Sequence, residues 1–378
     1  MDDASYKSAG VDIEGADESV ERIRDLVAGT HSKNVLSGIG GFGGLYGLDA
    51  SKYNNPVLVS STDGVGTKSY IASKGGIFNT IGIDLVAMCV DDLVCTGAEP
   101  LFMLDYVSVE RLNPEIIEDI VSGVAKGCKI AKCSLIGGEM AEHPPERAPG
   151  NAEHPPEHAP GNAEHPPVTD YKFDLAGFAV GIVERDKMLD PSRVELGDEL
   201  IGVFSPGIRC NGYSLARHVL LELANRKLDE LVWPGAQRTL LEELLLPSRI
   251  YAPSILQLIH SVEVHGIAHI TGGGIPGNLP RVLPSELSAT IDAGSWGVPR
   301  IFYEIQSLGN ISMDEMSRVF NLGIGMVVVV GKGCGHKAVS LLERYGEQAS
   351  VIGSIVENEA NSSCKINWSG SSSLKDFT

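Results

Sequence analysis

Apolar residues recur at every third or fourth position in several segments of the chain. In residues 17–28, Val20, Ile23, Leu26 and Val27 form one such stripe between charged neighbours. A stripe with this period predicts a helix with one buried face. We expect helices over five segments of this kind: residues 17–28, 84–97, 114–131, 215–223 and 254–264.

Between these segments lie short apolar runs that end in glycine or polar residues, which is typical of buried strands. We expect strands at seven such runs: residues 56–60, 100–107, 134–136, 174–183, 198–204, 267–270 and 327–330. Strands mixed with helices predict an α+β (mixed α/β) chain. A break near residues 184–191 favours two domains, residues 1–185 and residues 186–378.

One segment breaks this alternation. Residues 141–151 are followed by a near copy at residues 152–162, and the two copies differ only at Arg147 and His158. Dense prolines favour extended, solvated chain over a packed unit, so we expect an insertion loop at residues 141–167. We interpret the repeat as a tandem duplication tolerated in a surface loop, and prefer this to a histidine metal site.

Composition and charge narrow the function. The chain has 378 residues, 43% of them hydrophobic, and a formal net charge of −19. Because nucleic-acid binding needs clustered Lys and Arg, a broad nucleic-acid face is excluded. An anionic small substrate is compatible with this charge, provided that local cations or Mg²⁺ offset the global field.

The sequence also indicates where the protein acts. Its N-terminus is acidic and polar, unlike a signal peptide, and apolar runs such as residues 324–330 are too short to span a membrane. The seven cysteines include no C-x-x-C pair, which argues against zinc and redox motifs. We therefore expect a cytoplasmic protein with reduced thiols, without a membrane or nucleic-acid partner.

The element Asp63-Gly64-Val65-Gly66-Thr67-Lys68 follows the first expected strand. Its glycines let the backbone bend and leave amide groups free to face anions. Asp63 could hold Mg²⁺, Thr67 could hydrogen-bond a phosphate oxygen and Lys68 could neutralise phosphate charge. These are the components of a nucleoside triphosphate site, although not of a Walker A loop. The alternative is a plain Asp-Gly turn.

The helix expected at residues 84–97 carries carboxylates among apolar residues. Asp84 and Asp91 are seven residues apart, on one helix face, and Asp92 follows. Such carboxylates are costly unless paired, hydrogen-bonded or bound to metal. Either they cap the helix and mark its solvated edge, or together with Asp63 they supply oxygen ligands for Mg²⁺.

Other glycine-containing loops are candidates for contact with a ligand. Residues 37–45 hold five glycines and form either a flexible loop or a backbone cradle for phosphates. Residues 205–214 form either an anion site before a helix or a turn with Ser214 as helix cap. The glycines of residues 271–274 suggest close backbone approach, and Glu139 follows two glycines at a strand end.

Together these elements resemble the phosphoribosylformylglycinamidine cyclo-ligase family, also called aminoimidazole ribonucleotide synthetase. The similar motifs, in order, are Tyr6–Ile13, the glycine run, Thr62–Lys68, Gly82–Val90, Gly97–Pro100, Gly137–Glu139, Asn211–Leu215, Ile270–Gly274 and Asn321–Met326. The resemblance covers nearly the whole chain outside residues 141–162 and the C-terminal end.

The resemblance implies two domains, of which the N-terminal one pairs with its twin through a dimeric β-sheet, barrel-like interface. The C-terminal domain is α/β, and ATP binds near the junction of the dimer and the domains. The implied reaction belongs to de novo purine synthesis: formylglycinamidine ribonucleotide and ATP give aminoimidazole ribonucleotide, ADP and phosphate. The implied partners are this small ribonucleotide and a second copy of the chain, and the cofactors are ATP and Mg²⁺.

From the residues and the resemblance together we predict three sets of site residues. The predicted catalytic residues are Asp63, Lys68, Glu139 and Asn211. The predicted contacts to ATP and phosphate are Gly40, Gly41, Gly43, Gly64, Gly66, Thr67, Lys68, Arg209, Ser214, Thr271, Gly272 and Gly273. The predicted Mg²⁺ ligands are Asp63, Asp84, Asp91 and Asp92.

The chain departs from the family pattern at three places near these residues. Asp91 stands where the family usually has Asn, Met140 where it usually has Thr, and Arg209-Cys210 where it usually has His-Ser. Arg209 could bind phosphate but cannot shuttle a proton near neutral pH. The alternatives are therefore a weakened homologue that acts as a nucleotide sensor or scaffold, or a related small-molecule kinase.

Overall fold

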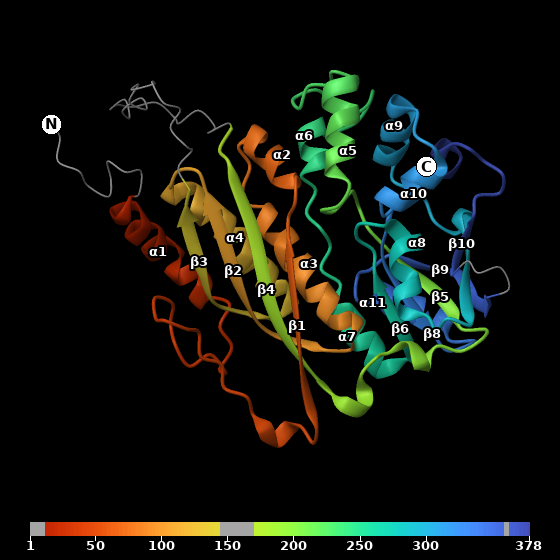
Figure 1. Cartoon of the computed structure of the whole chain (residues 1–378), viewed down its shortest axis with the longest axis horizontal. Coiled ribbons are helices and arrows are strands. Elements are labelled where there is room, and N and C mark those ends of the chain that lie inside the picture. The colour runs from red at the N-terminus through yellow and green to blue at the C-terminus, as the bar shows by residue number, and fades with distance from the viewer. Residues whose placement is uncertain (1–11, 144–169, 359–362) are drawn as a thin grey trace.

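The computed structural model describes residues 12–143, 170–358 and 363–378. Two β-sheets lie side by side, with the helices α3 (Ile81–Cys95) and α7 (Ala252–Ser261) between them (Figure 1). The predicted α+β class is confirmed. The predicted repeat falls largely outside the described residues, as does most of the Tyr6–Ile13 motif. Within the described parts, no helix is long and apolar enough to cross a membrane.

The first sheet has the strand order β1-β4-β2-β3. Its strands are β1 (Pro56–Gly64), β2 (Glu99–Val109), β3 (Ser134–Glu142) and β4 (Phe173–Glu184). Strand β4 is antiparallel to both β1 and β2, whereas β2 and β3 are parallel. The sheet is open within one chain, so the barrel-like interface implied by the resemblance would need a second chain and stays a prediction.

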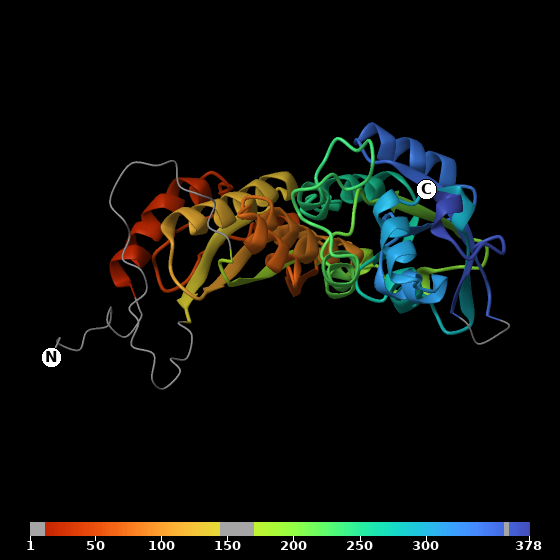
Figure 2. The ribbon, with the colours of Figure 1, turned by 90° about the horizontal axis from the view of Figure 1, so that it is seen from above.

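Helices cover one face of this sheet, as Figure 2 shows. They are α1 (Ile13–Ala28), α3 and α4 (Pro114–Ala131), and the short α2 (Lys68–Gly75) follows β1. The opposite face carries Leu58, Tyr106 and Phe178, which are 64%, 40% and 40% exposed. Because β1 alternates between exposed and covered positions, Asp63 lies on the helix-covered side of the sheet.

The second sheet has the order β10-β7-β9-β5-β8-β6, antiparallel except for the β10/β7 pair. Its strands are β5 (Glu199–Phe204), β6 (Val264–His269), β7 (Leu287–Asp292), β8 (Ile324–Val330), β9 (Ala349–Glu357) and β10 (Cys364–Asn367). Around it lie α5 (Tyr213–Arg217), α6 (Leu240–Leu244), α7, α8 (Gly274–Asn278), α9 (Arg300–Gly309), α10 (Met313–Val319) and α11 (Gly335–Arg344).

The predicted helices and strands are present, with two shifts. The helix expected at residues 254–264 is α7, which ends at Ser261, and Val264 already begins β6. The helix expected at residues 215–223 consists of α5 followed by a wider π-helical turn, His218–Leu223. The apolar periodicity located these segments correctly. It could not separate the end of α7 from the equally apolar start of β6, and it does not distinguish a π-helical turn from an α-helical one.

Helix α3 forms the centre of the molecule. Nearly all of its residues are buried, and one apolar core runs from α3 into β5, α7 and β8 of the second half. Gly82 of α3 lies so close to α4 that a Cβ there would be 2.2 Å from the Val124 nitrogen. This close packing places the C-terminal end of α3, with Asp91 and Asp92, between the two sheets.

Candidate active site

Three loops that follow strands meet between the two halves of the chain. The Thr67 Oγ1 after β1 is 3.4 Å from the Ser214 Oγ, which lies beyond β5. A Cβ built at Gly66 would lie 3.7 Å from the Cys210 carbonyl oxygen, and one at Gly272 would lie 3.6 Å from the Asn211 amide nitrogen. The structure therefore brings the predicted elements at residues 63–67, 209–214 and 271–273 together.

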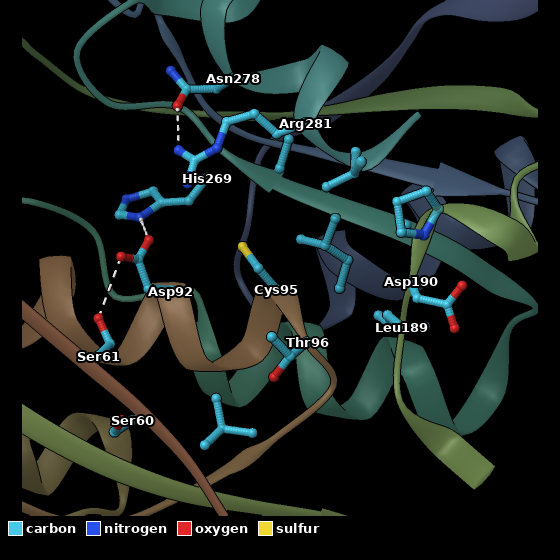
Figure 3. A pocket seen from close by; sticks show the side chains of 16 residues that line it. Ser60, Ser61, Asp92, Cys95, Thr96, Leu189, Asp190, His269, Asn278 and Arg281 are labelled. Atoms are coloured by element: carbon cyan, nitrogen blue, oxygen red, sulfur yellow. Dashed lines mark hydrogen bonds and ion pairs between the residues drawn. The ribbon is translucent and has the colours of Figure 1, made fainter. Parts of the chain in front are cut away.

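Polar side chains beside these loops form a hydrogen-bonded row. The Ser61 hydroxyl donates to Asp92 Oδ2 at 3.3 Å, and His269 Nδ1 is 2.8 Å from Asp92 Oδ1. Ser61 and Asp63 point to the same side of β1, so the carboxyl of Asp63 lies next to this row. Figure 3 shows Ser61, Asp92 and His269 along the wall of a pocket.

The two carboxylates of this region have pKa values that move in opposite directions. Burial raises the pKa of Asp63, and the negative charge of Asp92 adds to that effect. Burial would also raise the pKa of Asp92, but its hydrogen bonds to His269 and to the Ser61 hydroxyl lower it. Opposed shifts in adjacent carboxyl groups are a feature of functional sites.

A pocket of about 340 Å³ opens beside this row. Ser60, Ser61 and Asp92 line it from the first half, and His269, Asn278 and Arg281 line it from the second (Figure 3). The pocket thus has serine, imidazole and guanidinium groups within reach of one ligand.

Of these six pocket residues, sequence reasoning predicted only Asp92; it missed Ser60 and Ser61 of β1 and the three residues of the second half. His269 ends the strand that runs into the glycine turn, and that position was the only available signal for it. The Asn278 amide donates to the carbonyl oxygens of Gly272 at 3.1 Å and Gly274 at 2.8 Å, and Arg281 donates to the Asn278 Oδ1 at 3.3 Å. Asn278 therefore fixes the shape of the glycine turn.

Lys68 was predicted to contact phosphate and Asp84 to bind Mg²⁺, but in the structure the two side chains bind each other. Their side chains form an ion pair of 2.7 Å and both are 0% exposed. Lys68 Nζ also donates to the Leu246 carbonyl oxygen at 2.7 Å, and Asp84 Oδ1 accepts from the Ser248 backbone nitrogen at 2.8 Å. In this structure the two charges satisfy each other inside the protein.

Asp91 and Arg209 also face each other. Asp91 Oδ2 accepts from Arg209 Nη2 at 3.1 Å, and the two side chains are 0% and 2% exposed. Asp91 Oδ1 accepts from the backbone nitrogens of Tyr251 at 2.9 Å and Ala252 at 3.2 Å, at the N-terminus of α7. Asp84 and Asp91 do lie on one face of α3, but that face packs against residues 246–252.

The four predicted Mg²⁺ ligands are consequently not gathered into one cluster. Across the described ranges, no group of three or more His, Cys, Asp and Glu side chains is close enough to hold a metal. Asp63 and Asp92 are the two that lie at the loop junction, whereas Asp84 and Asp91 have buried partners.

Glu139 lies on a different strand from the loop junction. Glu139 is exposed. Across the sheet, Gly64 of β1 pairs with Ala176 of β4, Ala176 pairs with Tyr106 of β2, and Tyr106 pairs with Glu139 of β3. Since β1 and β3 are opposite edges of the sheet, Glu139 is separated from Asp63 by two strands.

The glycine run also lies beside β3. A Cβ built at Gly44 would be 2.7 Å from the Ile136 carbonyl oxygen, whereas nothing lies within 4 Å of one at Gly40 or Gly43. The predicted phosphate contacts of Gly40, Gly41 and Gly43 therefore lie apart from the loop junction within one chain, and stay predictions.

Comparison with known proteins identifies the class to which this fold and junction belong. Residues 47–153 match the family described as AIR synthase related protein, N-terminal domain, and residues 195–363 match its C-terminal domain family. Solved structures of similar fold include thiamine-monophosphate kinase from Stenotrophomonas maltophilia (TM-score 0.65, 18% identity, covering 93% of this chain and 96% of that one). Another is hydrogenase maturation protein HypE in complex with ATP (TM-score 0.62, 16% identity, covering 94% and 93%).

Curated relatives are much more similar in sequence. The phosphoribosylformylglycinamidine cyclo-ligase of Carboxydothermus hydrogenoformans is 49% identical over 95% of this chain and 98% of its own length. The protein of the same name from Bacillus cereus is 46% identical over 93% and 96%. The chain belongs to the phosphoribosylformylglycinamidine cyclo-ligase family, and is an enzyme of the ligase class that serves purine biosynthesis.

Proposed function

We propose that the protein converts formylglycinamidine ribonucleotide and ATP to aminoimidazole ribonucleotide, ADP and phosphate at the junction of its three loops. The observation that carries this proposal is the meeting of Asp63, Thr67, Asn211 and Ser214 with the glycine turn at residues 271–273. Relatives that are 45–49% identical over nearly the whole chain and carry the name of this activity support it.

The reaction needs an activated amide oxygen, because such an oxygen is a poor leaving group. ATP supplies the phosphoryl group that makes it one, after which a nitrogen of the same substrate closes the ring. The enzyme's task is to position phosphates and fold the substrate, more than to provide a nucleophile. Thr67, Ser214 and the backbone amides of residues 271–273 are suited to hold phosphate oxygens.

The residues present fit a magnesium ion at Asp63. Mg²⁺ usually binds one or two carboxylates together with substrate phosphates and water, so a preformed protein cage is not required. The ion would neutralise charge during phosphoryl transfer. Asp63 and Asp92 provide the carboxylate oxygens, and Asp63, whose pKa burial raises, would gain most from a nearby cation.

We further propose that the enzyme is a cytoplasmic homodimer. All seven cysteines are free, which fits a reducing compartment. The uncovered face of the first sheet exposes Leu58 and Phe178, and exposed apolar side chains that gather on one sheet face favour an interface. Leu58→Asp should shift the molar mass measured by light scattering to that of one chain, whereas Leu308→Asp, on α9 of the other half, should not.

The activity is tested by measuring ADP release from Mg²⁺-ATP with and without formylglycinamidine ribonucleotide, together with aminoimidazole ribonucleotide formation. Equal amounts of ADP and aminoimidazole product, dependent on the ribonucleotide, are expected. Binding of ATP without turnover would overturn the proposal in favour of a nucleotide sensor or scaffold.

A further inference from the structure

The Arg209 side chain is held by four neighbours in the interior. Its Nη2 lies 3.1 Å from Asp91 Oδ2 and 2.9 Å from His269 Nε2. Its Nη1 donates to the Arg249 carbonyl oxygen at 3.1 Å, and its guanidinium lies 5.0 Å from the centre of the Tyr251 ring. With 2% exposure, this guanidinium is not presented to a ligand in solution.

These contacts determine which nitrogen of His269 carries a proton. A guanidinium N–H can only donate, so His269 Nε2 must accept the hydrogen bond from Arg209. The ring proton of the neutral imidazole is then on Nδ1, which donates to Asp92 Oδ1 at 2.8 Å. Arg209 thereby fixes both the tautomer and the orientation of a ring that lines the pocket beside Asp63.

Arg209 is in turn dependent on Asp91. A buried cation without a partner is strongly destabilising, and so is a buried carboxylate. Asp91 and Arg209 are 118 residues apart in sequence and come from the two halves of the chain. They are also two of the positions that the sequence resemblance marks as departures from the family pattern. The two departures therefore meet in space and cancel in charge.

We propose that Arg209 is a positioning residue: with Asp91 it forms a buried ion pair that holds His269 in the Nδ1–H tautomer toward Asp92 and joins α3 to β6. Each member is tolerated in the interior only because the other compensates its charge. Its kinetic consequence rests on the proposed function, but its effects on stability and on the His269 tautomer do not.

The first test is a double-mutant cycle on thermal unfolding with Asp91→Asn, Arg209→His and the double variant. Each single change leaves one buried charge unpaired and should lower Tm by about 5 °C or more. The Tm of the double variant should recover at least about half of the larger single-variant loss, because the effects of mutations at contacting residues are not additive. Losses that simply add in the double variant would overturn the proposal.

An exposed ion pair serves as the matched control. Arg22 and Glu118 pair at 3.1 Å between α1 and α4, with side chains 36% and 42% exposed. Arg22→Gln, Glu118→Gln and their double variant should each change Tm by no more than about 1–2 °C, since exposed pairs contribute little.

The second test is ¹⁵N NMR of histidine-labelled protein, with the His269 signal assigned by His269→Gln. The wild-type ring should show a protonated Nδ1 and an unprotonated Nε2. Arg209→Lys keeps the charge but lacks the second terminal nitrogen, which anchors the guanidinium on the Arg249 carbonyl oxygen, so it should fold and show a changed tautomer mixture. A wild-type ring protonated at Nε2, or a tautomer unaffected by Arg209→Lys, would overturn the proposal.

The third test separates positioning from phosphate binding. For Arg209→Lys, kcat of ADP release should fall about tenfold or more while KM for ATP and for the ribonucleotide changes by less than about twofold. A raised KM for the ribonucleotide with kcat unchanged would instead assign Arg209 to substrate phosphate and contradict the positioning role.

Discussion

Asp91 and Asp92 are neighbours in sequence but have different environments in the structure. Asp91 is fully buried, and its carboxylate accepts hydrogen bonds from the N-terminus of α7 and from Arg209. Asp92 is partly exposed, faces His269 and lines the pocket. One step along a helix turns a side chain by about a quarter turn, so Asp91 faces interior partners while Asp92 faces the pocket.

At the residue scale, Asp63→Asn should separate activity from stability. The variant removes an oxygen anion proposed to hold Mg²⁺, so turnover should fall about a hundredfold or more. Because burial raises the pKa of Asp63, its ionised form is disfavoured in the folded protein, and Tm at pH 7 should be unchanged or higher. ADP release and calorimetry measure the two effects.

The matched control for that variant is Asp292→Asn. Asp63 Oδ1 accepts from the Gly64 backbone nitrogen at 2.7 Å, and Asp292 Oδ1 likewise accepts from the Gly294 backbone nitrogen at 2.9 Å. Asp292, however, is exposed and remote from the loop junction. It should keep full turnover. Wild-type rates in Asp63→Asn would show that Asp63 does not hold the metal.

A second residue-scale prediction concerns the pH dependence of stability. His265 Nδ1 lies 2.7 Å from Asp198 Oδ2, and Nε2 lies 3.5 Å from Glu263 Oε1. Burial alone would lower the pKa of His265, but the hydrogen bond and charge of Asp198, with Glu263, raise it above its ordinary value. The stabilisation is therefore complete below the unfolded-state pKa and is lost as pH rises through the folded-state pKa.

His265→Gln should accordingly cost about 1 kcal/mol at pH 5.5 and less at pH 8.5. The measurement is the urea unfolding midpoint at both pH values, with the exposed His260→Gln as control. An equal loss at the two pH values would contradict the raised pKa.

At the element scale, α3 connects the two halves of the chain. It packs on β1, β4 and α4 of the first half and on α7 and β6 of the second. Asp84 and Asp91 of α3 form buried ion pairs with Lys68 of the first half and Arg209 of the second. The helix is therefore held by ion pairs as well as by its apolar surface. A change in the position of α3 would therefore move Asp92 relative to the glycine turn.

Gly82→Ala should test this close packing. A Cβ at Gly82 would meet Val124 N at 2.2 Å and Ile120 O at 2.5 Å, both backbone atoms that cannot rotate away. Overpacking of this kind typically costs about 1–3 kcal/mol, and turnover should fall with it as α3 shifts. Chemical denaturation measures the loss.

Gly277→Ala is the control for that change, because Gly277 is also helical and a Cβ there has nothing within 4 Å. It should have stability equal to or above that of the wild type. Equal stability of the two alanine variants would mean that α3 and α4 can move apart without loss.

For the whole molecule, removing the repeat at residues 141–162 tests whether the fold and the activity need this segment. Glu142 at the end of β3 accepts from the backbone nitrogens of Asp12 at 2.9 Å and Leu112 at 2.8 Å. When residues 141–162 are removed, Met140 is followed by Ala-Glu-His again. If the repeat is the surface loop that the sequence predicts, the deletion should keep Tm within about 2 °C and turnover within about twofold, because such loops tolerate changes in length.

The control for the deletion is the shortened chain with Glu164→Ala. This variant removes the carboxylate that takes the place of Glu142 and should lower Tm relative to the shortened chain. Loss of activity in the simple deletion would show that the repeat takes part in function.

The helices, the strands and the candidate ligand loops could be predicted from the order of the amino acids alone. Apolar periodicity located α3 and the strands, because burying those side chains is the dominant local preference. The glycine–acid element after β1 and the glycine turn after β6 were recognisable as candidate ligand loops, because few other residues allow such backbone approach. The spacing of Asp84 and Asp91 also placed them on one helix face.

What that helix face contacts depends on how the two halves of the chain pack. A helical period gives the direction of a side chain but not the element packed against it, so the partners of Asp84 and Asp91 could not be foreseen. Lys68 and Arg209 were predicted as phosphate contacts from their charge, and each is instead buried against a carboxylate. Pairings between residues more than a hundred positions apart depend on how the two sheets pack, which no local pattern encodes.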